Sequence, residues 1–122
     1  MSRIRLLAGS LTVSAALLLG GVATALPASA TTYTCGNQGS HYTGTALTSR
    51  GDTGNRVIEV QCLLKAGGYL SAGQVDGIFG SQTETAVRNF QSAYHRWCDS
   101  GLAVDGIVGP YTWGALRSNC PS

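Results

Sequence analysis

One stretch of this chain occurs twice, and this repetition constrains the fold more than any other feature. Residues 75–90 read VDGIFGSQTETAVRNF and residues 104–119 read VDGIVGPYTWGALRSN, at an offset of 29 residues. Each copy predicts a tight Asp-Gly turn followed at once by a helix. Two such units are too few for an open solenoid, which needs about three or more repeats. A further helix before the first copy is therefore expected to complete a small closed core.

The first 30 residues are predicted to be a secretory signal peptide rather than part of the fold. Arg3 and Arg5 give a positive start, Leu6 to Leu19 is mostly apolar, and Ala28-Ser29-Ala30 is a small-residue cleavage pattern. The apolar run is short for a bilayer span and carries polar residues, which disfavours a stable membrane anchor. Cleavage would leave 92 of the 122 residues, enough for one small secreted domain.

The predicted mature chain carries no net charge. Its six lysine and arginine residues balance six aspartate and glutamate residues, so the formal +2 of the whole chain comes from Arg3 and Arg5. A nucleic-acid binder needs a basic footprint, because neutralising phosphates supplies most of its affinity. The composition therefore argues against a nucleic-acid partner.

Four cysteines, Cys35, Cys62, Cys98 and Cys120, follow the predicted cleavage point. An even number of cysteines in an oxidising compartment predicts two disulfides, which help a domain with a limited core. Zinc is the rival use of these residues. Cys98 lies three residues after His95, but no second pair shows zinc-finger spacing, so no metal site and no cofactor are expected.

Helical geometry favours one disulfide pairing. If Val57, Val60 and Leu64 face the core, Cys62 points roughly the opposite way. An outward cysteine reaches a segment lying over the outside of the domain more easily than the end of a core-packed helix. The expected pairs are Cys35–Cys62 and Cys98–Cys120, and the alternative is Cys62–Cys120 with Cys35–Cys98.

The apolar spacing predicts helices over residues 54–66, 82–97 and 110–118. Residues 31–52 show no helical or strand period and are expected to form an irregular N-terminal arm. Residues 53–120 would then be the domain proper, an all-α, small three-helix orthogonal bundle with disulfides. Asp52 or Thr53 is expected to cap the first helix, and Ser81 with Glu84 fits a capping box at the second, although Ser81 could instead be its first residue.

The two turns carry further expectations. Gly77 and Gly106 are expected to adopt positive φ, which other residues rarely tolerate. Gly80 and Gly109 are expected to allow close backbone approach at the helix starts. The isoleucines of both turns, at positions 78 and 107, are expected to point back into the core.

The order and spacing of these residues resembles the peptidoglycan-binding domain 1 family. The resemblance covers residues 54–116 and implies a three-helix wall-binding module of the kind often attached to cell-wall hydrolases. One departure is Val60, where a leucine is usual, and another is that no attached catalytic domain is expected. The matching residues are Gly54, Val57, Val60, Gln61, Leu64, Gly68-Tyr69, Asp76-Gly77, Phe79-Gly80, Thr83, Ala86-Val87, Phe90-Gln91, Asp105-Gly106, Val108-Gly109-Pro110, Thr112-Trp113 and Leu116.

A lytic enzyme would need a set of polar catalytic residues, and the sequence offers little. His41 falls in the arm, and His95 is expected at the surface. Glu59 lies away from the core stripe and is expected to be solvated, while Glu84 is explained as a capping partner. A glycosidase needs two carboxylates across a cleft. The chain is therefore interpreted as a non-enzyme with no catalytic residues.

A binding module needs only a shallow groove with exposed aromatic and polar side chains. The candidate ligand-binding residues are Arg50, Tyr69, Trp97 and Tyr111, each of which could also serve packing. The function indicated is a secreted, extracellular or wall-associated module that binds peptidoglycan through its glycan strand or stem peptide. The alternative is a protein-interaction module, an inhibitor or partner of a separate cell-wall hydrolase. A third reading is a stable wall-associated surface protein with no specific ligand.

Overall fold

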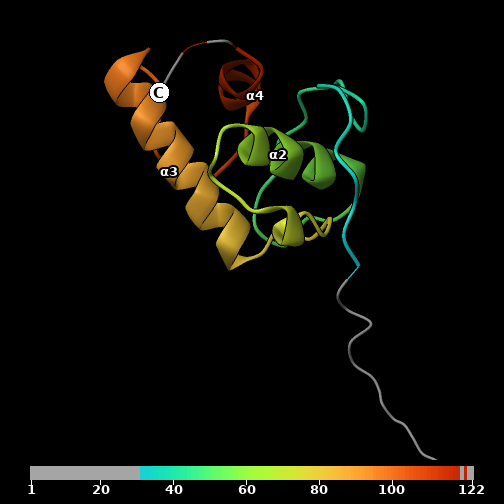
Figure 1. Cartoon of the computed structure of the whole chain (residues 1–122). Helices are drawn as coiled ribbons and strands as arrows, with labels where there is room; N and C mark the ends of the chain where they lie inside the picture. Colours follow the sequence, from blue (N-terminus) through green and yellow to red (C-terminus); the bar gives the residue numbers. More distant parts are fainter. Residues whose placement is uncertain (1–30, 119, 121–122) are drawn as a thin grey trace, which may run out of the picture. The chain divides into compact units, whose positions relative to one another are not determined.

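Three α-helices and the turns between them make up the fold (Figure 1). The computed structural model describes residues 31–118 and 120, so the predicted signal peptide lies outside the described residues. The helices are α2 (Asn55–Ala66), α3 (Ser81–Trp97) and α4 (Pro110–Leu116), with a short 3-10 helix, η4 (Ala72–Gln74), between the first two. The described residues form two isolated β-bridges and no strand. The predicted all-α, three-helix class is confirmed.

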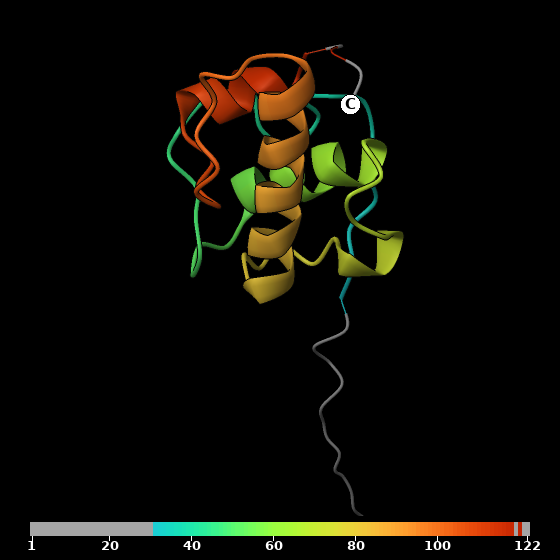
Figure 2. The ribbon, with the colours of Figure 1, turned by 90° about the vertical axis from the view of Figure 1, so that its left-hand side faces the viewer.

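The helices lie crosswise around one core. α2 packs against both α3 and α4, and Figure 2 shows α3 running across α2 with α4 near its C-terminal end. The core side chains are Val57, Val60, Leu64, Leu70, Phe79, Ala86, Val87, Val108, Trp113 and Leu116. Phe90 is partly buried against this cluster. In the part of the chain that is described, no helix is long and apolar enough to cross a bilayer.

The predicted helix ends are close to the observed ones. The predicted cap of the first helix, Asp52 or Thr53, and the capping box at the second are wrong, whereas the alternative with Ser81 as the first residue of its helix is confirmed. Gly54, Gly80 and Gly109 occupy the three N-cap positions, and none of these caps includes a side-chain hydrogen bond. Ser81 is the first residue of α3, one position after the N-cap, so its hydroxyl does not cap the helix. Glu84 pairs instead with Arg50 at 2.8 Å.

Each Asp-Gly turn is held by a buried glutamine from the helix that precedes it. Gly77 has φ +77°, as predicted. The Gln61 side-chain oxygen accepts the Gly77 amide proton at 2.9 Å, while its nitrogen donates to Asp76, to the Ile78 carbonyl and to Thr83. The second turn has the same arrangement, with Gly106 also at φ +77°. These glutamines fix each turn onto the start of the following helix.

Two other expectations for the turns are wrong. Ile78 and Ile107 are 53% and 38% exposed, so they point outward rather than into the core. A Cβ atom on Gly80 or Gly109 would meet nothing within 4 Å, so neither glycine marks a close approach. Phe79 and Val108, one position further on, are the buried residues. The backbone therefore turns the side chain after each isoleucine inward.

The N-terminal arm crosses both turns. Thr48 and Val108 exchange backbone hydrogen bonds of 2.9 and 2.8 Å, and Thr53 forms an antiparallel bridge with Ile78. The Trp113 indole nitrogen donates to the Ala46 carbonyl at 2.8 Å. The arm thus satisfies polar groups of the turns and of α4 that the three helices leave unpaired.

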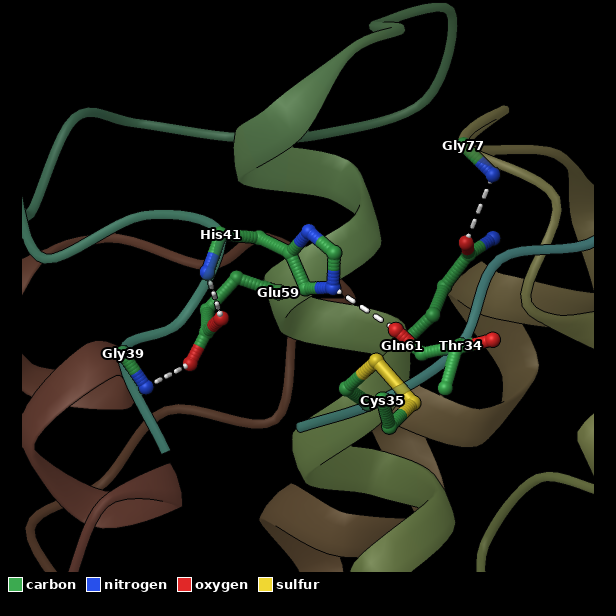
Figure 3. Close-up of a disulfide and its surroundings, with 8 residues drawn as sticks. Thr34, Cys35, Gly39, His41, Glu59, Gln61 and Gly77 are labelled. Atoms are coloured by element: carbon green, nitrogen blue, oxygen red, sulfur yellow. Dashed lines mark hydrogen bonds between the residues drawn. A yellow bond between two sulfur atoms is a disulfide. The ribbon is translucent and has the colours of Figure 1, made fainter. Parts of the chain in front are cut away.

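Glu59 is a buried anchor for the arm, and the expectation that it is solvated is wrong. It is 1% exposed, and its carboxylate accepts the backbone N–H groups of Gly39 and His41, the latter at 3.1 Å (Figure 3). The helical spacing of apolar residues shows which face of α2 meets the other helices, but it does not show what covers the opposite face. In this structure the N-terminal arm covers that opposite face.

Two disulfides tie the flanking segments to the helices. Cys35 in the arm is bonded to Cys62 on α2, and Cys98 at the end of α3 is bonded to Cys120. This is the pairing that the sequence analysis favours. Each disulfide fastens a segment that lies outside the three helices.

Candidate ligand-binding groove

A groove of about 340 Å³ opens where the C-terminal half of α2 meets the ends of the flanking segments. α2 and the turn after it form its floor, α4 contributes its last residues, and the arm and the C-terminal tail supply two walls. The lining residues are Gly36, Asn37, Gln38, Glu59, Cys62, Leu63, Ala66, Gly67, Tyr69, Phe90, Ala115, Leu116, Ser118 and Cys120. Both disulfides reach this groove, through Cys62 and Cys120.

Tyr69 has the best-defined position of the four predicted ligand-binding residues. It follows the glycine pair that ends α2, and its amide donates to the Leu64 carbonyl at 2.8 Å. Its ring meets Phe90 edge to face, with ring centroids 5.7 Å apart and planes at 89°. A Cβ atom on Gly67 would lie 3.2 Å from the Tyr69 ring carbons. Phe90 therefore packs against the Tyr69 ring, and the missing side chain at Gly67 leaves room for that ring.

Tyr69 also lines a second hollow, of about 270 Å³, on the side of α3. This hollow is bordered by amide and hydroxyl side chains. Its lining residues are Tyr69, Leu70, Gln74, Ser81, Gln82, Thr85, Ala86 and Asn89. Tyr69 is thus common to two concave regions. The amides of α3, Gln82 and Asn89, are not among the residues predicted from the sequence, although both lie on the polar face of a predicted helix.

The other three predicted ligand-binding residues do not line either hollow beside Tyr69. Tyr111 is 88% exposed and borders a different hollow with Tyr94 and Leu102. Trp97 is 66% exposed at the end of α3. Arg50 lies in the arm and forms its ion pair with Glu84. The structure therefore does not gather the four into one site.

The acidic groups act in holding the fold. Glu59 binds arm backbone amides, and Glu84 contacts Arg50 and Arg88. The Ser49 amide, which donates to Asp52 at 2.9 Å, lowers the pKa of that carboxyl, and Arg56 acts in the same direction. Among the described residues, no three histidine, cysteine, aspartate or glutamate side chains come together as a metal site.

A small crossed-helix domain with a polar groove at its surface defines a binding module. The chain belongs to the peptidoglycan-binding family described as "Putative peptidoglycan binding domain", whose pattern residues 53–116 match. The matched segment contains all three helices and both Asp-Gly turns. The arm before residue 53 and both outer cysteines, Cys35 and Cys120, lie outside it.

Similar proteins fall into two groups by the share of their length that aligns. An uncharacterized protein from the bpoA1 3' region of Kitasatospora aureofaciens is 40% identical over 96 residues, which cover 79% of this chain and 76% of that protein. The zinc D-Ala-D-Ala carboxypeptidase of Streptomyces albus G is 40% identical over 78 residues, 62% of this chain but 28% of the carboxypeptidase. The chain thus spans less than a third of that hydrolase.

The solved structures give the same result for the fold. The crystal structure of the SleB N-terminal domain superposes with a TM-score of 0.52 and 41% sequence identity. The superposition covers 60% of this chain and 90% of the SleB domain. The fold is therefore shared with this domain.

Proposed function

We propose that this chain is a secreted, non-catalytic module that binds bacterial cell-wall peptidoglycan through the groove beside Tyr69. The family match over residues 53–116 is the observation that carries the proposal. The groove supports it, because a concave region with an ordered aromatic ring and nearby polar groups suits a carbohydrate or peptide ligand. The proposed site uses Tyr69 first, with Arg50, Trp97 and Tyr111 as further candidates for contacts with an extended polymer.

Secretion and the absence of catalysis belong to the same proposal. Two disulfides suit an oxidising compartment outside the cytoplasm, and residues 1–30 read as an export signal. The aligned part of the Streptomyces carboxypeptidase is less than a third of that enzyme. The two glutamates here hold the arm and form ion pairs. Among the described residues that line the groove, Glu59 has no second acid or base opposite it.

Co-sedimentation with purified sacculi tests the proposal. The oxidised protein, expressed from residue 31, should pellet with sacculi at low and at moderate salt, because specific contacts survive screening that removes loose electrostatic adsorption. A turbidity assay on the same samples should show no clearing. Clearing that depends on this protein would establish an enzyme instead, and protein that stays in the supernatant with several wall types would overturn the binding function.

The second candidate is a protein-interaction module that acts on a separate cell-wall hydrolase. The strongly exposed aromatic side chains Trp97 and Tyr111 favour it, because exposed aromatic residues are enriched at protein interfaces. This function predicts that the protein binds a purified hydrolase and changes the rate of that enzyme. The protein-interaction function would be supported if a Trp97→Ala, Tyr111→Ala double variant no longer changed the rate and neither protein bound sacculi.

A further inference from the structure

The two hollows beside Tyr69 lack the charges that an anionic ligand needs. Among the described residues that line them, none is a lysine, arginine, histidine or aspartate. Glu59 is the one carboxyl group present, and it is buried and bonded to arm amides. A free carboxylate of a stem peptide would meet no cation among the described lining residues, and in the first hollow it would meet the buried Glu59 charge. Backbone N–H groups at the start of α3, where Ser81 and Gln82 line the second hollow, are the donors that remain for it. The charge pattern therefore disfavours the stem peptide.

Uncharged hydrogen-bonding groups take the place of charges. Asn37 and Gln38 stand in the arm wall, and Gln82 and Asn89 stand on α3. All four are exposed. The side-chain amides of Asn37, Gln38 and Asn89 form no hydrogen bond with other described residues. Each amide offers both donors and acceptors, which matches the hydroxyl and acetamido groups of a neutral sugar.

The Tyr69 ring adds an apolar surface between these two sets of amides. Sugar rings present C–H groups on one face, and an aromatic ring held in a fixed orientation can cover that face without losing much side-chain freedom. Phe90 packs edge to face against the Tyr69 ring, for which Gly67 leaves room. Because Tyr69 lines both hollows, a ligand that crosses it can place one sugar on each side.

Resting on the proposed function, we infer that the hollows on either side of Tyr69 bind the glycan strand, as a run of uncharged N-acetylated amino sugars, and not the stem peptide. The arm supplies one wall through Asn37 and Gln38, and α3 supplies the other through Asn89. Cys35–Cys62 holds the arm wall in place. Residues outside the family match thus take part in the choice of ligand.

The test uses two soluble probes on the oxidised protein. One is a β-1,4-linked hexamer of N-acetylglucosamine, and the other is a synthetic stem pentapeptide with a free carboxyl end. Amide shifts in a nitrogen-15 NMR titration should move around Tyr69, Asn89 and Asn37 with the hexamer and stay unchanged with the pentapeptide. The hexamer should also release the protein from sacculi. Shifts around Tyr69 with the pentapeptide alone would overturn the inference.

Matched variants separate binding from folding. Asn89→Ala should weaken hexamer binding several-fold, whereas Asn55→Ala, an exposed amide that lines neither hollow, should bind like the wild type. Tyr69→Ala should weaken binding roughly ten-fold or more, and Tyr69→Phe should retain most of it. Gly67→Ala keeps the aromatic ring but forces it to shift by a few tenths of an ångström, so it should also weaken binding. Equal affinity in Asn89→Ala and Asn55→Ala would count against the site.

Different experimental results would overturn glycan binding beside Tyr69 and wall binding as such. If the protein pellets with sacculi but the hexamer neither shifts resonances near Tyr69 nor competes, the wall is bound through another component and only the inference is overturned. If the protein does not pellet with any sacculi, the proposed function is overturned and the inference falls with it. Competition by the hexamer together with shifts near Tyr69 supports both.

Discussion

Gln61 on α2 and Gln91 on α3 share four hydrogen bonds to the two Asp-Gly turns, and Gln91 accepts one more from the Asp105 amide. The Gln91 side-chain nitrogen donates to Asp105, to the Ile107 carbonyl and to Thr112, and its oxygen accepts the Gly106 amide proton at 2.8 Å. Gln61 forms the equivalent set with the first turn. The structure therefore repeats a turn together with the buried amide that holds it, although the two glutamines lie 30 residues apart and the two turns 29.

Replacing either glutamine should destabilise the fold strongly. Gln61→Met or Gln91→Met keeps the approximate volume but leaves buried backbone and side-chain groups unpaired, with an expected cost of about 2 kcal/mol or more. Chemical denaturation measured by circular dichroism would give the free energy of unfolding. Gln38→Met is the matched control, because Gln38 is exposed, and it should change stability little. Equal effects at buried and exposed sites would contradict this account of the turns.

The positive φ of Gly106 should make substitution there costly. In Gly106→Ala the new Cβ would lie 3.0 Å from Glu84 Cγ and in an unfavourable backbone conformation, with an expected loss of about 1–2 kcal/mol. Gly114→Ala is the control. Gly114 lies inside α4 with open space around it, so alanine should be neutral or stabilise by up to about 1 kcal/mol. Thermal melts of both variants would show opposite shifts, and a stabilised Gly106→Ala would refute the strain argument.

The disulfide pairing can be checked directly. Peptide mapping under non-reducing conditions should recover linked peptides for Cys35–Cys62 and for Cys98–Cys120, and a linked Cys62/Cys98 peptide would refute the pairing. Replacing Cys35 and Cys62 together by serine frees the arm. On the loop-entropy estimate this costs roughly 3 kcal/mol, and it should lower Tm by more than about 10 °C in a domain of this size.

Asp52 should make the stability of the fold depend on pH. The Ser49 amide, with help from Arg56 and against a smaller effect of burial, lowers the pKa of the folded Asp52 carboxyl. A carboxyl with a lowered folded pKa stabilises the fold above its unfolded value, near pH 4, and this stabilisation is lost as pH falls through the folded pKa. Asp52→Asn should therefore lower Tm at pH 7 and make little difference near pH 2. The same difference at both pH values would contradict the assignment.

The remaining candidate contacts can be ranked by alanine substitution. Trp97→Ala, Tyr111→Ala and Arg50→Ala should fold normally, because these side chains are exposed and exposed ion pairs contribute little. Tyr69→Ala should reduce sacculus binding more than any of the three. The fraction pelleted at a fixed amount of sacculi is the measurement. A larger loss at Trp97 or Tyr111 would move the site to the end of α3.

The helices were predictable because each has a clear apolar stripe. Val57, Val60 and Leu64 define the core face of α2, and the observed helix begins and ends within about one residue of the prediction. Opposite that face, Cys62 could be placed as outward. The caps were not predictable, because serine and glutamate near a helix start suggest a box even where a glycine already occupies the cap.

The arm and the site could not be predicted as well. The arm has no helical or strand periodicity, so its path over α2 could not be predicted from the sequence. For the same reason the sequence predicts a solvent-exposed Glu59, although the arm buries it. Tyr69 was a correct candidate for a position beside a groove, since it follows the glycine pair that ends α2. The groove itself depends on which segments the chain brings beside that tyrosine, and this follows from the disulfides and the arm bridges.

The bridge between Thr48 and Val108 has a consequence for the order in which the molecule assembles. Helical domains usually fold quickly because their contacts are local in the chain, but these two residues lie 60 positions apart. The Thr48 end of the arm cannot dock until Val108 has emerged from the ribosome. Folding therefore cannot proceed to completion from the N-terminal end. The part of the arm that covers Glu59 pairs with α2 and can dock early, whereas the Thr48 end waits for the second turn.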